Sequence, residues 1–315
     1  MSTLQQPDKV IALLCSDIHI SQKPPRARRG EPSWFGAMAN TLNQLKGLAN
    51  HYSVPILCAG DIFDHWRADP ELINFAINYL PEMYAIPGQH DLPLHNIDLM
   101  ERSAYWTMVL IGRITPVTSY KAVVAPNNMV IHGFPWGTSI KPFEKESKKD
   151  HVALCHEYFW EGGHCFPTAP KANESKQYKD RIKGWHSVAF GDNHKGFLTE
   201  INKISVLNCG TLMRRKSDEV DYRPQIGLLC RSGKIIIQKL KIKMEKFTTL
   251  DEEFLGTRKM MRVHDLGDFM AGLTELQHKT FDFIEAIEFA MEEKIVKNSV
   301  RELIVESLGR GLDDE

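Results

Sequence analysis

Short hydrophobic runs alternate with segments of helical periodicity in the first third of the chain. The runs at 10–20, 54–61 and 83–88 are almost continuously apolar until they end in polar residues, which is typical of parallel strands buried on both faces. Between them, residues 35–49 and 70–80 repeat apolar side chains every three or four positions, as one face of an amphipathic helix does. This β-α-β-α-β order predicts a layered α/β fold.

Further hydrophobic runs in the middle of the chain predict strands at 128–132, 152–156, 187–191 and 203–208. A hairpin is predicted over 226–242, where two apolar runs flank a Ser-Gly turn. Two long polar insertions, 133–150 and 157–185, separate the strands. Loops of that length inside a compact domain are more often functional than idle, so both insertions are candidates for a binding surface.

The pattern changes after residue 245. The segment 281–295 places apolar side chains on one helical stripe and glutamates off that stripe. A Ser-x-x-Glu capping box then opens a last predicted helix. We therefore predict two domains, one over residues 1–245 and a helical C-terminal appendage over residues 246–315.

Composition places limits on partners and compartment. The 315 residues include 39 Lys and Arg against 40 Asp and Glu, a net charge of −1, so a nucleic-acid-binding surface has to be a local patch. The six cysteines are scattered without a CxxC pair, which indicates buried free thiols in a reducing compartment. The N-terminus lacks a signal-peptide pattern, and no apolar run reaches the ~18 residues of a membrane helix. We expect a cytoplasmic protein of a bacterial or phage-infected cell, without membrane contact.

Polar side chains follow five of the predicted strands at the point where each strand ends. In chain order these residues are Asp17 and His19, then Asp61, then Gln89, His90 and Asp91, then His156, and last Asp192 and His194. Ligand sites in open α/β sheets gather beyond the carboxyl ends of the strands. Each segment alone would be an ordinary turn or a buried histidine. Together, nitrogen and oxygen donors without cysteine indicate a centre for manganese, magnesium or iron, with zinc as a further option.

The order DxH, GDxxD, GxHD, H and GxxH over residues 10–215 resembles the calcineurin-like metallophosphoesterase superfamily. The stretches "GDIFDHWRADPEL" and "LNCGTLMR" more closely resemble the SbcD-type DNA repair nucleases and their phage relatives. This resemblance implies a four-layer α/β/β/α sandwich. It also implies two divalent ions, manganese above all, and hydrolysis of a phosphodiester by a water that the ions activate.

The resemblance also implies a role for individual residues. The ligands of the first ion would be Asp17, His19 and His194. The ligands of the second ion would be Gln89, His156 and Asp192. Asp61 would bridge the two ions, His90 would face the scissile phosphate, and Asp91 would orient the His90 ring, since a carboxylate behind an imidazole fixes its tautomer.

Two positions depart from the superfamily pattern, and both belong to the second ion. The superfamily usually has asparagine where this chain has Gln89, and histidine where it has Asp192. Both replacements still offer oxygen ligands, and only His156 remains as a nitrogen donor, which favours manganese or magnesium over zinc. The rival interpretation is that the second site has decayed and that one ion binds.

The substrate is predicted from the segments beside the metal ligands. The loop 21–34 follows Asp17 and His19 directly and is basic, and the insertion 157–185 combines lysines with aromatic residues. Such surfaces suit a nucleic-acid backbone and stacked bases, although charged loops are also often merely solvated. The candidate substrate-binding residues are Arg26, Arg28, Arg29, His132 and Trp160.

Three functions compete at this point. The leading prediction is a metal-dependent DNA exonuclease or endonuclease that acts in repair or recombination. The alternative is a phosphodiesterase or phosphatase that acts on nucleotides or other small phosphate esters. A non-catalytic scaffold would have lost His90 or Asp61, and both are present.

The resemblance also suggests partners. The DNA-capping domain that usually follows the catalytic core of SbcD-type nucleases is reduced or missing in this chain. In those nucleases a segment beyond the cap docks on an SMC-like ATPase of SbcC type, and the helices predicted at 281–308 could play that part. Packing of these helices on the chain's own core ranks first, and a homodimer is a further alternative.

Overall fold

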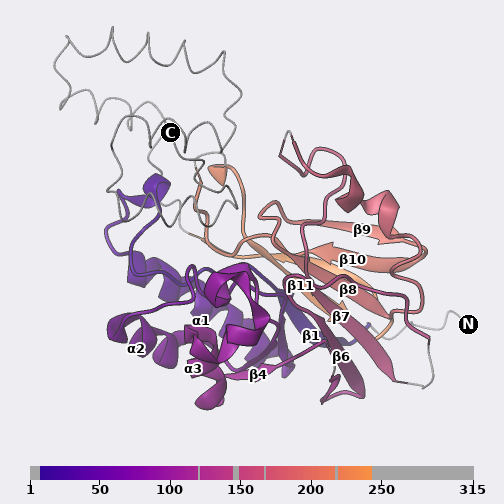
Figure 1. Ribbon diagram of the computed structural model, residues 1–315, viewed down its shortest axis with the longest axis horizontal. Helices are drawn as coiled ribbons and strands as arrows, with labels where there is room; N and C mark the ends of the chain where they lie inside the picture. The colour runs from indigo at the N-terminus through magenta and orange to yellow at the C-terminus, as the bar shows by residue number, and fades with distance from the viewer. Residues whose placement is uncertain (1–7, 120, 145–148, 167, 217–218, 243–315) are drawn as a thin grey trace, which may run out of the picture. The chain divides into compact units, whose positions relative to one another are not determined.

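Two six-stranded sheets form the core of the computed structural model, which describes residues 8–242 except 120, 145–148, 167 and 217–218. The first sheet has the order β12-β11-β1-β2-β3-β4, and Figure 1 labels its strands β1, β4 and β11. Its strands are β1 (Val10–Cys15), β2 (Ile56–Cys58), β3 (Met83–Ala85), β4 (Ile114–Pro116), β11 (Gln225–Cys230) and β12 (Ile235–Lys239). The second has the order β5-β6-β7-β8-β10-β9. Its strands are β5 (Val123–Ala125), β6 (Met129–Phe134), β7 (Asp150–His156), β8 (Ser187–Gly191), β9 (Phe197–Ile201) and β10 (Ile204–Asn208).

Parallel pairing aligns the carboxyl ends of the strands that carry the predicted motifs. β1, β2, β3 and β4 pair in parallel in the first sheet, and β6, β7, β8 and β10 do so in the second. The outer strands β11, β12, β5 and β9 pair antiparallel with their neighbours. The loops after β1, β2 and β3 therefore leave one edge of the first sheet, and those after β7 and β8 leave one edge of the second.

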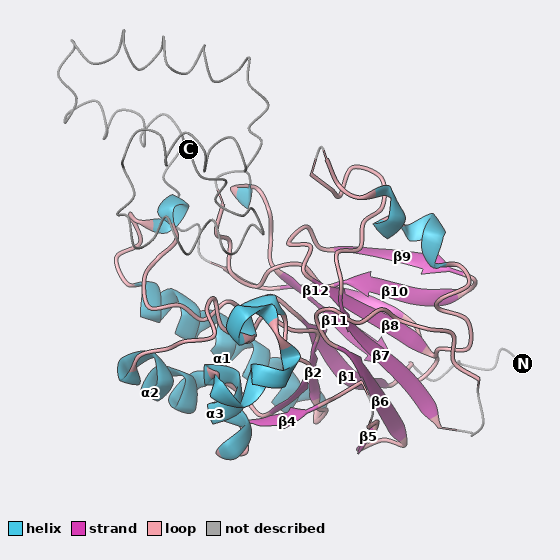
Figure 2. Ribbon diagram, in the orientation of Figure 1, coloured by secondary structure: helices cyan, strands magenta, loops and turns pink. Residues whose placement is uncertain are grey.

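Three helices cover the outer face of the first sheet (Figure 2). They are α1 (Trp34–Tyr52), α2 (Pro70–Tyr79) and α3 (Ala104–Leu110). Each begins at a side chain that accepts a hydrogen bond from the first turn, and these caps are Ser33, Asp69 and Ser103. Met38, Leu42 and Leu45 recur along one face of α1 and are fully buried against the sheet, which is the packing that the helical periodicity predicts.

A second hydrophobic core lies between the two sheets. Leu14 and Leu57 of the first sheet share it with Leu154 and Leu207 of the second. Along β7 the side chains alternate, because successive residues of a strand point to opposite faces: Leu154 faces this core, whereas Cys155 faces the outer side of the second sheet.

The outer face of the second sheet is covered by the insertion 157–185 rather than by long helices. Phe159 and Tyr178 are fully buried there and contact Phe190 of β8, with ring centroids 4.5 Å and 5.4 Å away. The helices among the described residues of the insertion are two short 3-10 helices, η5 (Lys171–Asn173) and η6 (Ser175–Tyr178). The predicted α/β/β/α sandwich is confirmed, and part of the insertion is its fourth layer. Its aromatic residues thus have a structural role that the sequence alone did not assign.

Most predicted elements correspond to observed ones. The predicted helices match α1 and α2, and the 226–242 hairpin matches β11 and β12. Short elements that the sequence analysis did not predict are α3, β4, β5 and β9, together with the 3-10 helices η1 (Arg26–Arg28), η2 (Gln89–Asp91), η3 (Pro93–His95) and η4 (Ile97–Arg102). All six cysteines are free thiols, and five of them are buried. Within the described residues, no helix is long and apolar enough to cross a membrane.

The predicted appendage over residues 246–315 lies outside the described residues, as do the helices at 281–308. The domain boundary at residue 245 and the partner predictions for those helices therefore stay predictions.

Candidate metal centre

Loops from both sheets bring their polar side chains together at the carboxyl ends of the strands. These loops and the end of β7 supply three overlapping groups of donor atoms that lie close enough to hold a metal ion. The groups are Asp17, His19 and His194; Asp17, Asp61 and His156; and His19, Asp64 and His90. Hydrogen bonds tie the two sheets here, since the backbone N–H of Asp192 donates to Asp17 Oδ1 (3.1 Å). The metal ligands predicted from separate strand ends thus share one site.

The backbone at this site is strained. Asp17, His19, Asp61 and Asp192 have positive φ angles of 50°, 51°, 52° and 82°, a left-handed conformation that non-glycine residues rarely adopt. Such conformations persist where surrounding structure enforces them, typically at functional sites. Each turns the chain sharply at a strand end, so that its side chain points back toward the centre.

Two motif glycines allow the loops to approach closely. A Cβ atom at Gly60, whose φ is +95°, would collide with the His156 ring, and one at Gly88 would collide with the Asp61 carboxylate. The glycines of the "GD" and "PG" pairs are therefore required by contact with candidate ligands as well as by turn geometry.

The first group is built from two histidines that face each other across an aspartate. His19 Nε2 lies 3.1 Å from His194 Nε2, and these atoms lie 3.9 Å and 4.0 Å from Asp17 Oδ1. Asp17 is fully buried, and burial raises the pKa of its carboxyl, although the neighbouring histidines oppose this. Burial lowers the pKa of His19 to about 4, so its ring is neutral and able to bind a metal at physiological pH.

A carboxylate stands behind each of these histidines. Asp64 Oδ1 lies 3.5 Å from His19 Nδ1, and Glu219 Oε1 lies 3.3 Å from His194 Nδ1. Glu219 is held in turn by the backbone N–H groups of Arg215 (2.6 Å) and Lys216 (3.1 Å). Carboxylates in this position orient a ligating imidazole and increase its basicity. Accordingly, Glu219 raises the pKa of His194 despite the opposing effect of burial.

The role of Glu219 is not predictable from the sequence, because Glu219 lies between β10 and β11 and belongs to no motif. Asp64 was expected only as part of the GDxxD pattern.

Asp61 occupies the middle of the centre. It is fully buried, and its Oδ1 accepts a hydrogen bond from the backbone N–H of His90 (2.9 Å). Its Oδ2 has no hydrogen-bond partner in the described structure, although it lies 3.4 Å from His156 Nε2, 3.8 Å from His19 Nε2 and 4.0 Å from His90 Nε2. Burial opposes ionisation, yet these histidines hold the pKa of Asp61 well below its usual range.

The second group is joined by Gln89. Its Nε2 donates to Asp192 Oδ1 (2.7 Å), and its Oε1 lies 2.6 Å from His156 Nε2. On its other side, His156 Nδ1 lies 2.6 Å from the carbonyl oxygen of Ala59. The three predicted ligands of the second ion therefore lie together, and in this structure Gln89 contacts both of the others.

The donor atoms fit a divalent cation. Because the Ala59 carbonyl only accepts, His156 Nδ1 carries a proton, and in the neutral ring Nε2 then presents a lone pair to Gln89 Oε1 and Asp61 Oδ2. Three acceptor atoms facing one another require a proton or a cation among them, since buried acceptors left unpaired are costly. The Asp61 carboxylate accordingly raises the pKa of His156 against the opposing effect of burial.

The structure changes the role predicted for Asp91. The partner of His90 Nδ1 is the backbone carbonyl oxygen of Asp64, at 2.8 Å, and not the Asp91 carboxylate. Asp91 instead accepts hydrogen bonds from the backbone N–H groups of Ile62, Phe63 and Gly88 (2.9–3.1 Å). Burial raises the pKa of Asp91 to about 7, while these donors favour the ionised form. The prediction that Asp91 orients His90 was wrong because adjacency in sequence does not fix where a side chain points: Asp91 locks the loop after β2 to the loop after β3.

The comparison with known families decides the class of the protein. A model of the calcineurin-like phosphoesterases matches residues 12–196, which span the two groups of candidate ligands. The chain belongs to the calcineurin-like phosphoesterase family. The family is dimetal-dependent and hydrolyses phosphate esters, and this phosphoesterase carries candidate clusters for both ions.

Solved structures that are similar to this phosphoesterase have low sequence identity to it. The TT1561 protein of Thermus thermophilus is 12% identical with a TM-score of 0.44, covering 74% of this chain and 99% of its own. A dimetal phosphatase of Danio rerio is 10% identical with a TM-score of 0.46, covering 74% and 96%. The calcineurin-like phosphoesterase YfkN of Bacillus subtilis is 13% identical with a TM-score of 0.41, covering 78% and 89%. No match was found among curated protein sequences.

A pocket of about 400 Å³ opens over the candidate ions of the phosphoesterase. His19, Gln89, His90 and Asp192 line its floor, and its walls carry two kinds of side chain. The aromatic ones are Tyr158 and Phe166, and the cationic ones are Lys195, Arg215 and Lys216.

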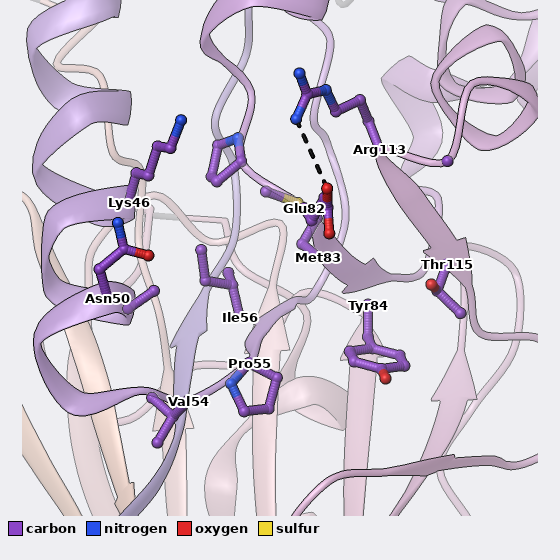
Figure 3. A pocket seen from close by; sticks show the side chains of 13 residues that line it. Lys46, Asn50, Val54, Pro55, Ile56, Glu82, Met83, Tyr84, Arg113 and Thr115 are labelled. Atoms are coloured by element: carbon purple, nitrogen blue, oxygen red, sulfur yellow. Dashed lines mark ion pairs between the residues drawn. The ribbon is translucent and has the colours of Figure 1, made fainter.

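A larger cavity, of about 460 Å³, lies at the opposite end of the first sheet, where β2, β3 and β4 begin (Figure 3). Lys46 and Arg113 lie on one side of it, and Val54, Pro55 and Tyr84 lie on the other. It contains none of the predicted ligands, so cavity size alone would misplace the site.

The predicted substrate-binding residues do not line the pocket in the described structure. Arg28 is buried, donating to Glu31 (2.9 Å) and to the carbonyl oxygen of Arg214 (3.1 Å), so it is not free to bind a substrate. His132 Nε2 contacts His151 Nδ1 (3.0 Å), and Trp160 Nε1 donates to the carbonyl oxygen of Pro170 (2.9 Å). The remaining two, Arg26 and Arg29, are exposed, and their role stays a prediction.

Proposed function

We propose that this phosphoesterase is a metal-dependent DNA nuclease of SbcD type that acts in DNA repair or recombination. The observation that carries the proposal is the composition of the pocket, whose lining combines a pair of contacting aromatic rings and three cations with the candidate metal ligands. Phosphate backbones are bound by such cations, and unpaired bases by such rings.

The aromatic wall supports the proposal. The ring centroids of Tyr158 and Phe166 lie 4.9 Å apart, and the backbone N–H of Phe166 donates to the Tyr158 hydroxyl (3.3 Å). Lys195 Nζ also donates to the carbonyl oxygen of Cys165 (3.3 Å). These contacts fix the aromatic pair against the edge of the pocket, where a base next to the scissile phosphate could stack on it.

The cationic wall supports it as well. Arg215 donates to the Asp64 carboxylate through Nη2 (2.6 Å) and to the carbonyl oxygen of His19 through Nη1 (3.3 Å). The Arg215 backbone N–H also donates to Glu219. Its guanidinium is therefore held at the pocket wall, and a fixed cation near a phosphate adds geometric specificity to charge attraction.

The chemistry assigned to each group follows from its surroundings. The first ion would be held by Asp17, His19 and His194. The second would be held by Gln89, His156 and Asp192. Asp61 would lie between them. The ions would supply Lewis-acid stabilisation of the phosphate and a nucleophilic water at neutral pH. Manganese or magnesium suits the oxygen-rich second site best.

His90 is the proposed proton donor to the leaving oxygen. Its Nδ1–H is committed to the Asp64 carbonyl oxygen, so Nε2 donates only when the ring is an imidazolium. Asp61 Oδ2 lies 4.0 Å from that Nε2 atom. The side chain is 42% exposed, which lets it reach a bound substrate.

The second candidate is a phosphodiesterase or phosphatase that acts on nucleotides or other small esters. Both candidates use the same metal centre, and they differ only in the part of the substrate that the pocket walls bind. A pocket of about 400 Å³ falls within the range of small-molecule sites, which favours this alternative.

One assay separates the candidates. Labelled single-stranded and double-stranded DNA, bis-p-nitrophenyl phosphate and cyclic nucleotides are each incubated with the manganese-loaded protein. We expect DNA hydrolysis that falls about 10²–10⁴-fold in His90→Ala and is unchanged in His51→Ala, a control in α1. Hydrolysis of small esters without cleavage of any DNA would refute the nuclease proposal and favour the alternative.

A further inference from the structure

The loop that follows His90 carries a leucine that is exposed and strained. Leu94 is 84% exposed, and its φ is 51°, followed by a φ of 56° at His95. Left-handed backbone suits glycine or asparagine, whereas leucine adopts it at a cost. An outlier of this kind, at a side chain that is largely exposed, points to a function of the side chain.

Ring contacts connect this loop to the second metal group. The ring centroids of His95 and Trp136 lie 6.3 Å apart, and those of Trp136 and His156 lie 6.4 Å apart. The Trp136 backbone N–H also lies 3.4 Å from the carbonyl oxygen of Pro87, in the turn before Gln89. His95 and Trp136 thus connect the loop to the second metal group, and Leu94 directly precedes His95 in that loop. These three residues, Leu94, His95 and Trp136, are called the rim below.

Trp136 of the rim and the residues of the pocket follow different strands of the second sheet. Trp136 follows β6, and β6, β7 and β8 are neighbouring parallel strands. His156 ends β7 between them, and the pocket with Tyr158 and Phe166 includes the residues that follow β8, Asp192 to Lys195. A nucleic-acid strand whose scissile phosphate lies over the candidate ions would thus contact apolar side chains on both sides of that phosphate.

We propose that Leu94 is a specificity-determining residue that contacts an unpaired base of the nucleic-acid strand, on the side of the scissile phosphate away from Tyr158. This inference rests on the proposed nuclease function. An apolar side chain that a strained backbone holds outward can pack against the face of a base that has no stacking neighbour. Every base has such a face, so the contact does not depend on sequence. The contact selects single-stranded or frayed substrate over small phosphate esters.

The test uses Leu94→Asn, which removes the apolar contact and places a residue that tolerates left-handed backbone. The matched control is Leu110→Asn, because Leu110 is also exposed (74%) but ends α3, on the outer face of the first sheet. Binding is measured by fluorescence anisotropy in the full-length protein carrying His90→Ala, with oligonucleotides that are intact or that contain one abasic site at successive positions.

We expect Leu94→Asn to bind the intact oligonucleotide about fivefold more weakly. One abasic position should weaken binding in the parent protein and have no effect in the variant. With His90 restored, hydrolysis of bis-p-nitrophenyl phosphate should be unchanged. The melting temperature of Leu94→Asn should equal or exceed that of the parent, and Leu110→Asn should bind DNA as the parent does.

Three results would overturn the inference. Equal affinity of the parent and of Leu94→Asn for the intact oligonucleotide would show that no base contacts the leucine. The same conclusion would follow if the abasic position still weakened DNA binding by the variant. A lower melting temperature would show that Leu94 packs against the protein itself. In all three cases the parent still binds DNA, whereas absence of DNA binding and cleavage by the parent would refute the nuclease proposal itself.

Discussion

The two halves of the candidate metal centre are organised differently. Behind His19 and His194 of the first group stand the carboxylates of Asp64 and Glu219, at 3.5 Å and 3.3 Å. In the second group a backbone carbonyl stands behind His156, and the donor atoms facing the centre are joined to one another through Gln89. In the first half the ligands are oriented by carboxylates outside the centre. In the second half the ligands are held by hydrogen bonds to one another.

This difference predicts unequal affinities. A site whose ligands are oriented from behind loses little freedom when an ion binds, and the anionic carboxylates make the imidazoles better donors. In the second half an ion has to replace the contact between Gln89 and His156, so part of its binding energy is spent on breaking it. The side chain of Gln89 is one methylene longer than the asparagine usual in the superfamily, which lets it reach both His156 and Asp192.

The largest effect is expected from Asp61→Asn, because Asp61 Oδ2 lies between the two halves, 3.8 Å from His19 Nε2 and 3.4 Å from His156 Nε2. Loss of its negative charge should remove both ions and lower phosphodiester hydrolysis at least about a thousandfold, since metal stabilisation contributes several kcal/mol. Metal analysis after dialysis against manganese, with Asp98→Asn as an exposed control, measures this. Retention of two ions per chain would contradict a bridging position.

Glu219→Gln should distinguish the halves. It keeps the size of the side chain and removes the charge behind His194, so the affinity of the first ion should fall about 10–100-fold while the second is unaffected. Calorimetric titration with manganese reads both affinities. Glu200, exposed on β9, provides the matched control Glu200→Gln. A fall in both affinities, or in neither, would argue against a role specific to the first half.

Gln89→Ala acts on the other half and should have a smaller effect. It removes one oxygen ligand and also frees His156 and Asp192 from their contact with Gln89, so the two consequences partly cancel. The affinity of the second ion should fall about tenfold, or by about 1.4 kcal/mol, with the first unchanged. Unchanged metal content together with unchanged activity would show that Gln89 is no ligand.

The smallest effect concerns a histidine outside the metal centre. Burial lowers the pKa of His132 to about 4 from its ordinary 6.5. Below pH 6.5 the unfolded chain therefore binds a proton that the folded protein does not, and stability falls as pH decreases from 6.5 toward 4. In His132→Phe the fall in the free energy of unfolding that His132 causes at low pH should be absent. Urea unfolding at pH 7 and pH 5 measures it, and equal pH dependence of parent and variant would contradict it.

The candidate metal ligands could be predicted from the sequence better than the residues that hold them in place. Asp17, Asp61 and His156 could be found because each ends a hydrophobic run, and parallel strands bring such ends together. Glu219 could not, because it acts through a turn that has no motif and no periodicity. Asp91 could not be placed either, since its position beside His90 gives no information about the direction of its side chain.

The role of charged side chains and the positions of short strands were also difficult to predict from the sequence. Arg28 stands in a basic loop, but its guanidinium is buried against Glu31 and the Arg214 carbonyl, contacts that depend on the folded chain. β4 and β5 have three residues each, too few for alternation of polar and apolar side chains to identify a strand.

The central claim is a two-ion centre whose first half is the better organised. Calorimetric titration of the metal-free protein with manganese tests it most directly. We predict two binding steps per chain, with the tighter step weakened by Glu219→Gln and the weaker step by Gln89→Ala. A single ion per chain, or two steps of equal affinity that both variants weaken alike, would contradict the account.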